Sequence, residues 1–320
     1  MTTYKGINGF AVQSLATDPT FDEGQVWYNN ASYAFKLAAL TTAGTWASGG
    51  NMPAGKSSMA SGGTQTAAFV AGGEPGNTSS TFNYNGTSWS PSGNLNTARQ
   101  SLLGCGTQTA GLAFGGYISD NTAATEKYDG TSWTSVTSMN TAVRSMGTAG
   151  IQTAALAFGG YTTANTAATE SYNGTSWTAG GNLNTARRGL GGAGTNTAAL
   201  GFGGYATTTS NATESYNGTS WTTTPATLNT AGQSFASFGT QTSALAANGR
   251  GAVTQSELYN GTSWTITGSM ALGRNGLRGT GNTTAGLGMG GYAPSTSSYS
   301  TATEEFTGSG AAVTQTVTVS

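Results

Sequence analysis

Glutamate and basic side chains recur at regular intervals in this sequence, and they are the groups best suited to acid–base chemistry. Each recurring glutamate stands two positions before a Tyr or Phe: Glu126, Glu170, Glu214, Glu257 and Glu304. The matching cations are Lys56, Arg99, Arg144, Arg187 and Arg274. Two catalytic carboxylates must flank one reacting bond within about 10 Å, whereas these glutamates are spread along the chain. We therefore expect several of them to form structural ion pairs with the cations.

Other side chains that commonly carry catalysis or bind metals are scarce. The sequence has no histidine, which removes the commonest general base and metal ligand. Cys105 is the only cysteine, so an intrachain disulfide is impossible. We expect a protein that is not an enzyme and that uses no cofactor and no metal. A glycoside hydrolase is the least favoured alternative.

The overall charge is low for a chain of 320 residues. Charged residues make up 7% of the sequence and the net charge is -1, so no basic face is present to neutralise a run of phosphates. The first residues lack the pattern of a signal peptide, and no apolar run approaches the roughly 18 residues of a membrane span. We therefore expect no nucleic-acid partner, no membrane span and no signal peptide, with synthesis in the cytoplasm.

Tryptophans and glycine pairs mark an internal repeat of about 44 residues. The tryptophans are Trp46, Trp89, Trp133, Trp177, Trp221 and Trp264. Glycine pairs stand between them at residues 72–73, 115–116, 159–160, 203–204 and 290–291, and Asn-Gly takes that place at residues 248–249. Self-similarity at a fixed period indicates a repeat architecture, in which each period is one structural unit.

Each unit reads as four short strands separated by turns. A Gly-Thr-Gln-Thr turn such as residues 106–109 separates the first two strands, and the glycine pair ends the second. Asn-Gly or Asp-Gly, a strong hairpin signal, separates the third strand from the fourth, which begins at Thr-Ser-Trp. Four antiparallel strands in a repeat of this length are typical of a β-propeller blade. The order Gly-Gly, Tyr and Trp resembles the kelch repeat over about residues 41–320, which implies an all-β, kelch-like β-propeller.

The number of blades depends on how the first 50 residues are interpreted. Residues 51–320 contain six complete repeats, and residues 1–50 span about one more period. We favour seven blades of four strands, with a divergent first blade in residues 1–50. Six blades closed by an N-terminal strand at Trp46 is the alternative, and residues 1–50 then include an N-terminal attachment segment.

One face of such a propeller carries the variable loops. The loops between the second and third strands differ from unit to unit, at residues 74–79, 118–122, 162–166, 206–211, 250–255 and 293–299. Aromatic and basic side chains on this face are candidate ligand-binding residues: Tyr117, Tyr161, Tyr205, Tyr292, Arg99, Arg144, Arg187 and Arg274. Aromatic rings beside hydroxyl and amide groups suit neutral glycans. The alternative is structural, with each tyrosine covering its own glycine pair and the cations paired inside the fold.

A second resemblance concerns the N-terminal residues. Residues 23–29 (EGQVWYN) and 35–37 (FKL), in a background rich in Gly, Thr, Ala and Asn, resemble segments of bacteriophage tail-fibre and other virion proteins. This implies a structural or binding protein of the virion: a tail fibre, a receptor-binding protein or a capsid-surface protein. Its partners would be other virion proteins through the N-terminal segment, host-surface glycan, and further copies of itself in an oligomer. A free lectin-like propeller is the alternative.

Overall fold

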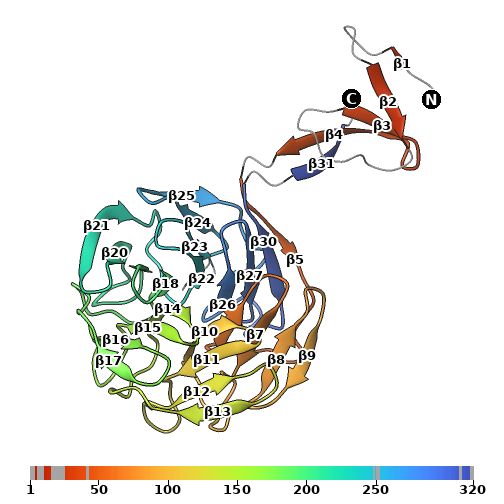
Figure 1. The fold of residues 1–320 in the computed structure, drawn as a ribbon. Helices are drawn as coiled ribbons and strands as arrows, with labels where there is room; N and C mark the ends of the chain where they lie inside the picture. Colours follow the sequence, from red (N-terminus) through yellow and green to blue (C-terminus); the bar gives the residue numbers. More distant parts are fainter. Residues whose placement is uncertain are drawn as a thin grey trace. The chain divides into compact units, whose positions relative to one another are not determined.

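The computed structural model describes residues 4–5, 11–15, 26–40, 43–247, 249, 253–309 and 312–317. Their regular structure is entirely β, as the sequence predicts (Figure 1). The chain forms two compact units, Met1–Gly44 with Thr307–Ser320, and Thr45–Phe306. Within the described residues, no helix is long and apolar enough to cross a membrane.

The larger unit contains six four-stranded sheets among its described residues. The first three are β6 (Ala60–Gly63), β7 (Ala68–Ala71), β8 (Thr81–Tyr84) and β9 (Trp89–Ser92); β10 (Leu103–Thr107), β11 (Ala110–Phe114), β12 (Thr125–Tyr128) and β13 (Trp133–Val136); and β14 (Gly147–Ile151), β15 (Ala154–Phe158), β16 (Thr169–Tyr172) and β17 (Trp177–Ala179). The next two are β18 (Gly191–Gly194), β19 (Ala199–Phe202), β20 (Ala212–Tyr216) and β21 (Trp221–Thr227); and β22 (Ala236–Gly239), β23 (Ala244–Ala247), β24 (Ser256–Tyr259) and β25 (Trp264–Thr267).

The last sheet combines strands from both ends of the unit. Its order is β26 (Arg278–Gly281), β27 (Ala285–Met289), β30 (Thr303–Thr307) and β5 (Thr45–Ser48). A short hairpin of β28 (Tyr292–Ala293) and β29 (Ser298–Tyr299) lies between β27 and β30 in the chain. The first strands of successive sheets contact one another in the cycle β6, β10, β14, β18, β22, β26 and back to β6 (Figure 1). The larger unit therefore has a β-propeller-like architecture.

The strand pairing differs from the seven-sheet arrangement that we favoured. In the smaller unit β1 (Tyr4–Lys5), β2 (Ala11–Leu15), β3 (Val26–Asn29), β4 (Ala34–Leu40) and β31 (Ala312–Val317) form a separate five-stranded sheet, in which β2 and β3 are parallel. No Trp follows Trp264, so the last repeat lacks a fourth strand of its own, and β5 with Trp46 supplies it. The pairing matches the alternative in which a strand at Trp46 completes the last sheet. Of the segment that resembles virion proteins, residues 23–25 lie outside the described residues.

The hydrophobic core lies mainly between successive sheets. Phe114 of one sheet packs edge-on against Trp177 of the next, with ring centroids 5.0 Å apart. The indole of Trp177 also donates a buried hydrogen bond of 3.1 Å to Thr125 Oγ1 of the preceding sheet. Equivalent bonds join Trp89 to Thr303, Trp133 to Thr81, Trp221 to Thr169 and Trp264 to Thr213. The periodic Trp is therefore the residue that joins one sheet to the next.

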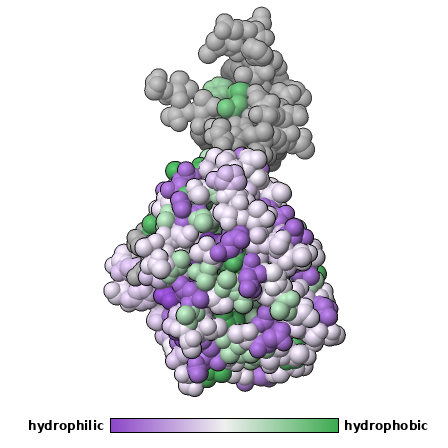
Figure 2. Space-filling model, turned by 90° about the vertical axis from the view of Figure 1, so that its left-hand side faces the viewer, coloured by the Kyte–Doolittle hydropathy of each residue, from purple (hydrophilic) through white to green (hydrophobic). Residues whose placement is uncertain are grey.

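Small residues line the first strands because those strands approach one another closely. A Cβ atom at Gly192 in β18 would lie 2.3 Å from the carbonyl oxygen of Thr148 in β14. On the side of this unit that Figure 2 displays, polar and near-neutral residues predominate and apolar residues are scattered.

Candidate functional site

Three of the four arginines that we predicted as ligand donors are fully buried in ion pairs. Arg99 pairs with Glu126 at 2.5 Å and Arg187 pairs with Glu214 at 2.7 Å. Arg274 pairs with Glu304 at 2.6 Å. Each arginine lies on the connector before the first strand of its sheet, and its glutamate lies on the third strand. The structural pairing that the spacing predicts is therefore confirmed for these three, and no surface of their side chains faces solvent.

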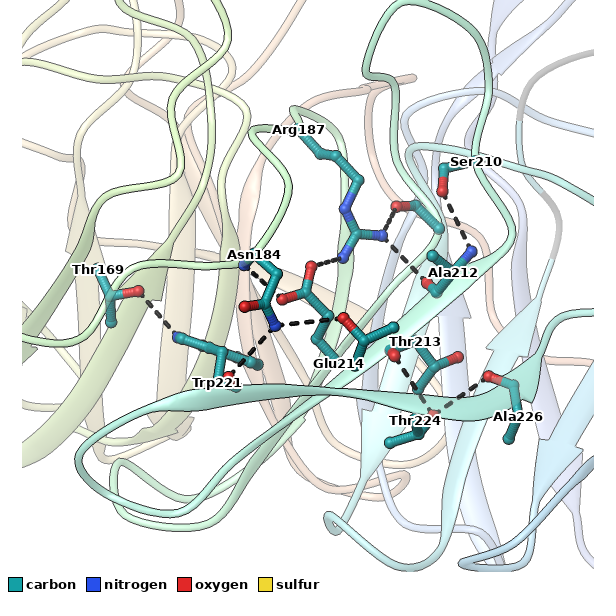
Figure 3. Close-up of polar contacts among 12 residues, drawn as sticks. Thr169, Asn184, Arg187, Ser210, Ala212, Thr213, Glu214, Trp221, Thr224 and Ala226 are labelled. Atoms are coloured by element: carbon teal, nitrogen blue, oxygen red, sulfur yellow. Dashed lines mark hydrogen bonds and ion pairs between the residues drawn. The ribbon is translucent and has the colours of Figure 1, made fainter.

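Each buried glutamate also fixes the connector that passes over it. Figure 3 shows Glu214 between Arg187 and Asn184, whose backbone N–H donates to Glu214 Oε2 at 2.7 Å. Where no arginine is present, a second backbone N–H replaces it: Glu170 accepts hydrogen bonds from the N–H groups of Asn140 and Thr141 at 2.8 and 3.0 Å. The glutamates thus anchor loops inside the fold.

Lys56 and Arg144 do not form the ion pairs that we expected. The first repeat has Phe82 where the others have glutamate, so Lys56 instead donates to Gly72 O at 2.9 Å and Thr78 Oγ1 at 2.8 Å. Burial lowers the pKa of Lys56 to about 8. In the third repeat, Val143 occupies the position that Arg187 has in the fourth. The backbone shows this equivalence, because Gly116 N–H donates to Val143 O just as Gly160 N–H donates to Arg187 O. Arg144 therefore stands one residue after the buried position.

Arg144 belongs instead to a half-buried row of alternating rings and cations. The guanidinium carbon of Arg144 lies 4.6 Å from the ring centroid of Tyr117 and 5.1 Å from that of Tyr161. The guanidinium carbon of Arg188 lies 5.1 Å from the Tyr161 ring and 4.8 Å from the Tyr205 ring. We call Tyr117, Arg144, Tyr161, Arg188 and Tyr205 the tyrosine–arginine row. It crosses three successive sheets and combines side chains from three repeats.

Backbone pairing positions the row. Each tyrosine directly follows a glycine pair and forms an isolated antiparallel bridge, Tyr161 with Arg144 and Tyr205 with Arg188. The variable loops are also linked from repeat to repeat, since the Asn121 side chain donates to Tyr161 O at 3.1 Å and the Asn165 side chain donates to Tyr205 O at 2.9 Å. Loops of neighbouring repeats that are hydrogen-bonded to one another therefore hold the row in place.

The cations of the row have no acidic partner among the described residues. Their only side-chain hydrogen bond there runs from Arg188 Nη1 to Asn165 Oδ1 at 3.3 Å. Cation–π contacts orient a guanidinium without neutralising its charge. The row therefore combines half-buried tyrosine rings with N–H donors and positive charge. This combination suits a ligand that has both ring faces and anionic groups.

Tyr292 does not join the row. It bridges Asn275 and contacts the Tyr299 ring, with centroids 5.4 Å apart. Of the eight predicted ligand residues, Tyr117, Tyr161, Tyr205 and Arg144 come together. The variable loop at residues 250–255 lies partly outside the described residues.

Sequence reasoning missed Arg188, although a signal was present. The residues that bridge the tyrosines all stand 17 positions before them: Gln100, Arg144, Arg188 and Asn275. Arg99 and Arg187 stand 18 positions before a tyrosine. The spacing to the tyrosine therefore distinguishes the arginines of the row, at 17 positions, from those in buried ion pairs, at 18.

The tyrosine–arginine row contains no acidic side chain, histidine or cysteine. Within the described part of the chain, no three His, Cys, Asp or Glu residues are grouped so as to hold a metal ion. Burial raises the pKa of the Cys105 thiol to about 12, so it is an unreactive thiol at neutral pH. No protein-family model matches the chain, and no curated protein matches it either.

Proposed function

We propose that this chain is a non-enzymatic virion component of a bacteriophage, a tail-fibre, receptor-binding or capsid-surface protein. Its larger unit is a six-bladed, kelch-like propeller that presents the tyrosine–arginine row to a glycan of the host surface. The observation that carries the proposal is the row itself, with two uncompensated guanidinium groups held between three tyrosine rings.

The row favours an acidic glycan over the neutral one that we expected from composition. Sugar rings stack on aromatic faces, and a carboxylate or sulfate group pairs with a guanidinium through charge-assisted hydrogen bonds. Each guanidinium already lies over tyrosine rings, so little side-chain entropy is lost when the ligand binds. An acidic polysaccharide with repeating units would contact several positions of the row at once.

The smaller unit supports a role in attachment. It holds both ends of the chain in one five-stranded sheet, separate from the six sheets of the larger unit. Val26, Tyr33 and Phe35 expose large apolar surface there, with Tyr33 82% exposed. Exposed apolar groups of this kind suit contact with another protein.

A glycan array of neutral and acidic oligosaccharides tests the ligand. The wild-type chain should bind acidic members, and Arg144→Gln with Arg188→Gln should weaken that binding by about tenfold or more through the loss of charged donors. Lys127→Gln is a control that removes one positive charge outside the row. Equal binding by the double variant and the control would contradict the role of the row.

Isolation of phage particles tests the virion assignment separately. The protein should copurify with intact particles at a fixed stoichiometry in mass spectrometry. Glycan binding without any association with particles would support the free lectin-like alternative, which the same row favours.

A further inference from the structure

A ring of six residues in the left-handed conformation surrounds the centre of the larger unit. One residue from each repeat takes part: Ser58, Ser101, Ser145, Gly189, Ser234 and Gly276, with φ between 54° and 64°. Backbone hydrogen bonds join neighbours in this ring, from Ser101 N to Ser58 O at 2.9 Å and from Ser145 N to Ser101 O at 3.0 Å, for example. All six residues line one small cavity of about 30 Å³.

Serine is an unexpected choice at four of these positions. A positive φ costs free energy for any residue with a Cβ atom, and glycine avoids that cost. Gly189 and Gly276 adopt the same conformation in two repeats, so the fold itself does not require a serine. The four serine hydroxyls have no hydrogen-bond partner among the described residues, and so they do not stabilise the ring. Unfavourable backbone conformations of this kind cluster at functional sites.

Arg278 supplies a cation to the same cavity. Its guanidinium donates only to backbone carbonyls, from Nε to Met59 O at 2.6 Å, and at 3.4 Å from Nη1 to Leu277 O and from Nη2 to Leu102 O. These contacts leave N–H groups free. Burial lowers the pKa of Arg278 to about 10, and the charge of Glu74 acts in the opposite direction, so the side chain is charged at neutral pH.

No negative charge in the cavity balances Arg278. It is the only charged residue among the described residues that line this cavity, and the same is true of a larger cavity of about 180 Å³ between the first strands, which Arg278 also lines. Glu74 forms no ion pair with it within 4.0 Å. Arg278 is half-buried, so its charge is only partly hydrated and would be stabilised by a neutralising partner.

We propose that this central cavity is a binding site for one small anion, of the size of a chloride ion or a single carboxylate group. Arg278 provides the charge, and the hydroxyls of Ser58, Ser101, Ser145 and Ser234 provide donors around it. The volume fits this class, since one water-sized occupant needs about 10–15 Å³ on the same measure. The site uses none of the residues of the tyrosine–arginine row, although Ser145 and Gly189 directly follow Arg144 and Arg188 in the chain.

Chloride NMR on the full-length chain tests the site, because exchange of chloride with a protein site broadens its resonance. The wild type should broaden the signal saturably, and formate, which carries one carboxylate, should reverse the broadening. Arg278→Gln should weaken chloride binding by about tenfold or more. Lys127→Gln, which removes a charge elsewhere, should leave it unchanged.

A second variant keeps the test valid if Arg278→Gln fails to fold. Ser58→Gly, Ser101→Gly and Ser145→Gly together remove three hydroxyls and replace them with the residue that the backbone prefers. The melting temperature should stay the same or rise, while chloride binding weakens. Wild-type broadening that does not saturate, or that persists in this folded variant, would overturn the proposal.

Discussion

At the scale of single residues, a buried carboxylate on the third strand is satisfied in two different ways. Glu126, Glu214 and Glu304 each face an arginine, whereas Glu170 and Glu257 accept a second backbone hydrogen bond instead. The carboxylate is therefore common to five of the six repeats, and an arginine faces it in three of them.

This difference predicts unequal costs for the same substitution. Glu126→Gln leaves Arg99 buried without a counter-ion and should lower the free energy of unfolding by about 3–5 kcal/mol. Glu170→Gln replaces an acceptor by an amide that cannot accept all of its hydrogen bonds, and should cost about 1–3 kcal/mol. Urea denaturation measures both. Glycan binding should be retained by each folded variant, and a larger loss for Glu170→Gln would contradict the assignment.

Lys56 predicts a dependence of stability on pH. Its pKa is lowered to about 8 in the folded chain from 10.5, because burial disfavours the charged amine. Between these values the unfolded chain binds more protons than the folded chain, so this group makes stability rise with pH. Unfolding of the wild type and of Lys56→Met, compared from pH 7 to pH 9.5, should show the wild type gaining stability relative to the variant.

The comparison with Lys56→Met is needed because other groups act in the opposite direction. The pKa of Cys105 is raised to about 12, so the unfolded chain loses that proton first as the pH rises. Both proteins share this effect, and the difference between them isolates Lys56. A stability difference between the two proteins that stays constant from pH 7 to pH 9.5 would contradict the lowered pKa of Lys56.

At the scale of elements, the turn between the first two strands joins neighbouring sheets. Gln152 of the third sheet donates from its side chain to Gly111 O at 2.9 Å and to Tyr128 O at 2.8 Å, both in the preceding sheet. Gln65, Gln108 and Gln241 make equivalent bonds. The recurrence of Gly-Thr-Gln-Thr therefore reflects contact between repeats as well as turn geometry.

The fourth repeat provides a natural control for this contact. Asn196 stands where four of the other turns have glutamine, and its shorter side chain makes no hydrogen bond within the described residues. Gln152→Ala should lower the free energy of unfolding by about 1–3 kcal/mol, since two carbonyls lose their donor. Asn196→Ala should change it by less than about 0.5 kcal/mol. Equal losses for the two variants, measured by chemical denaturation, would refute the role of the glutamine.

At the scale of the whole molecule, the last sheet of the larger unit depends on a strand from the start of the chain. β5 pairs with β30, and the Trp46 indole donates to Ser256 Oγ at 2.9 Å, in the preceding sheet. Trp46 also packs on Phe306, with ring centroids 5.1 Å apart. The larger unit therefore holds its first and last repeats together in one sheet.

Two truncated chains test the contribution of β5. A chain of residues 45–306 retains β5 and should melt cooperatively, near the temperature at which the larger unit melts in the full chain. A chain of residues 49–306 lacks the closing strand and should melt lower by roughly 10 °C or more, as expected for a loss of several kcal/mol in a chain of this size. Calorimetry measures both. Equal melting temperatures would exclude a stabilising role of β5.

The sequence alone determined the repeat, the four strands per unit and the structural use of the glutamates, because turns and strand patterns are local properties. Only the tertiary structure decided how the chain ends pair and which arginines reach the surface. Arg187 and Arg188 are adjacent, yet neighbouring residues of an extended chain project to opposite sides. Arg187 therefore enters an ion pair with Glu214, and Arg188 lies between Tyr161 and Tyr205. That difference of one residue separates the interior of this fold from its candidate binding site.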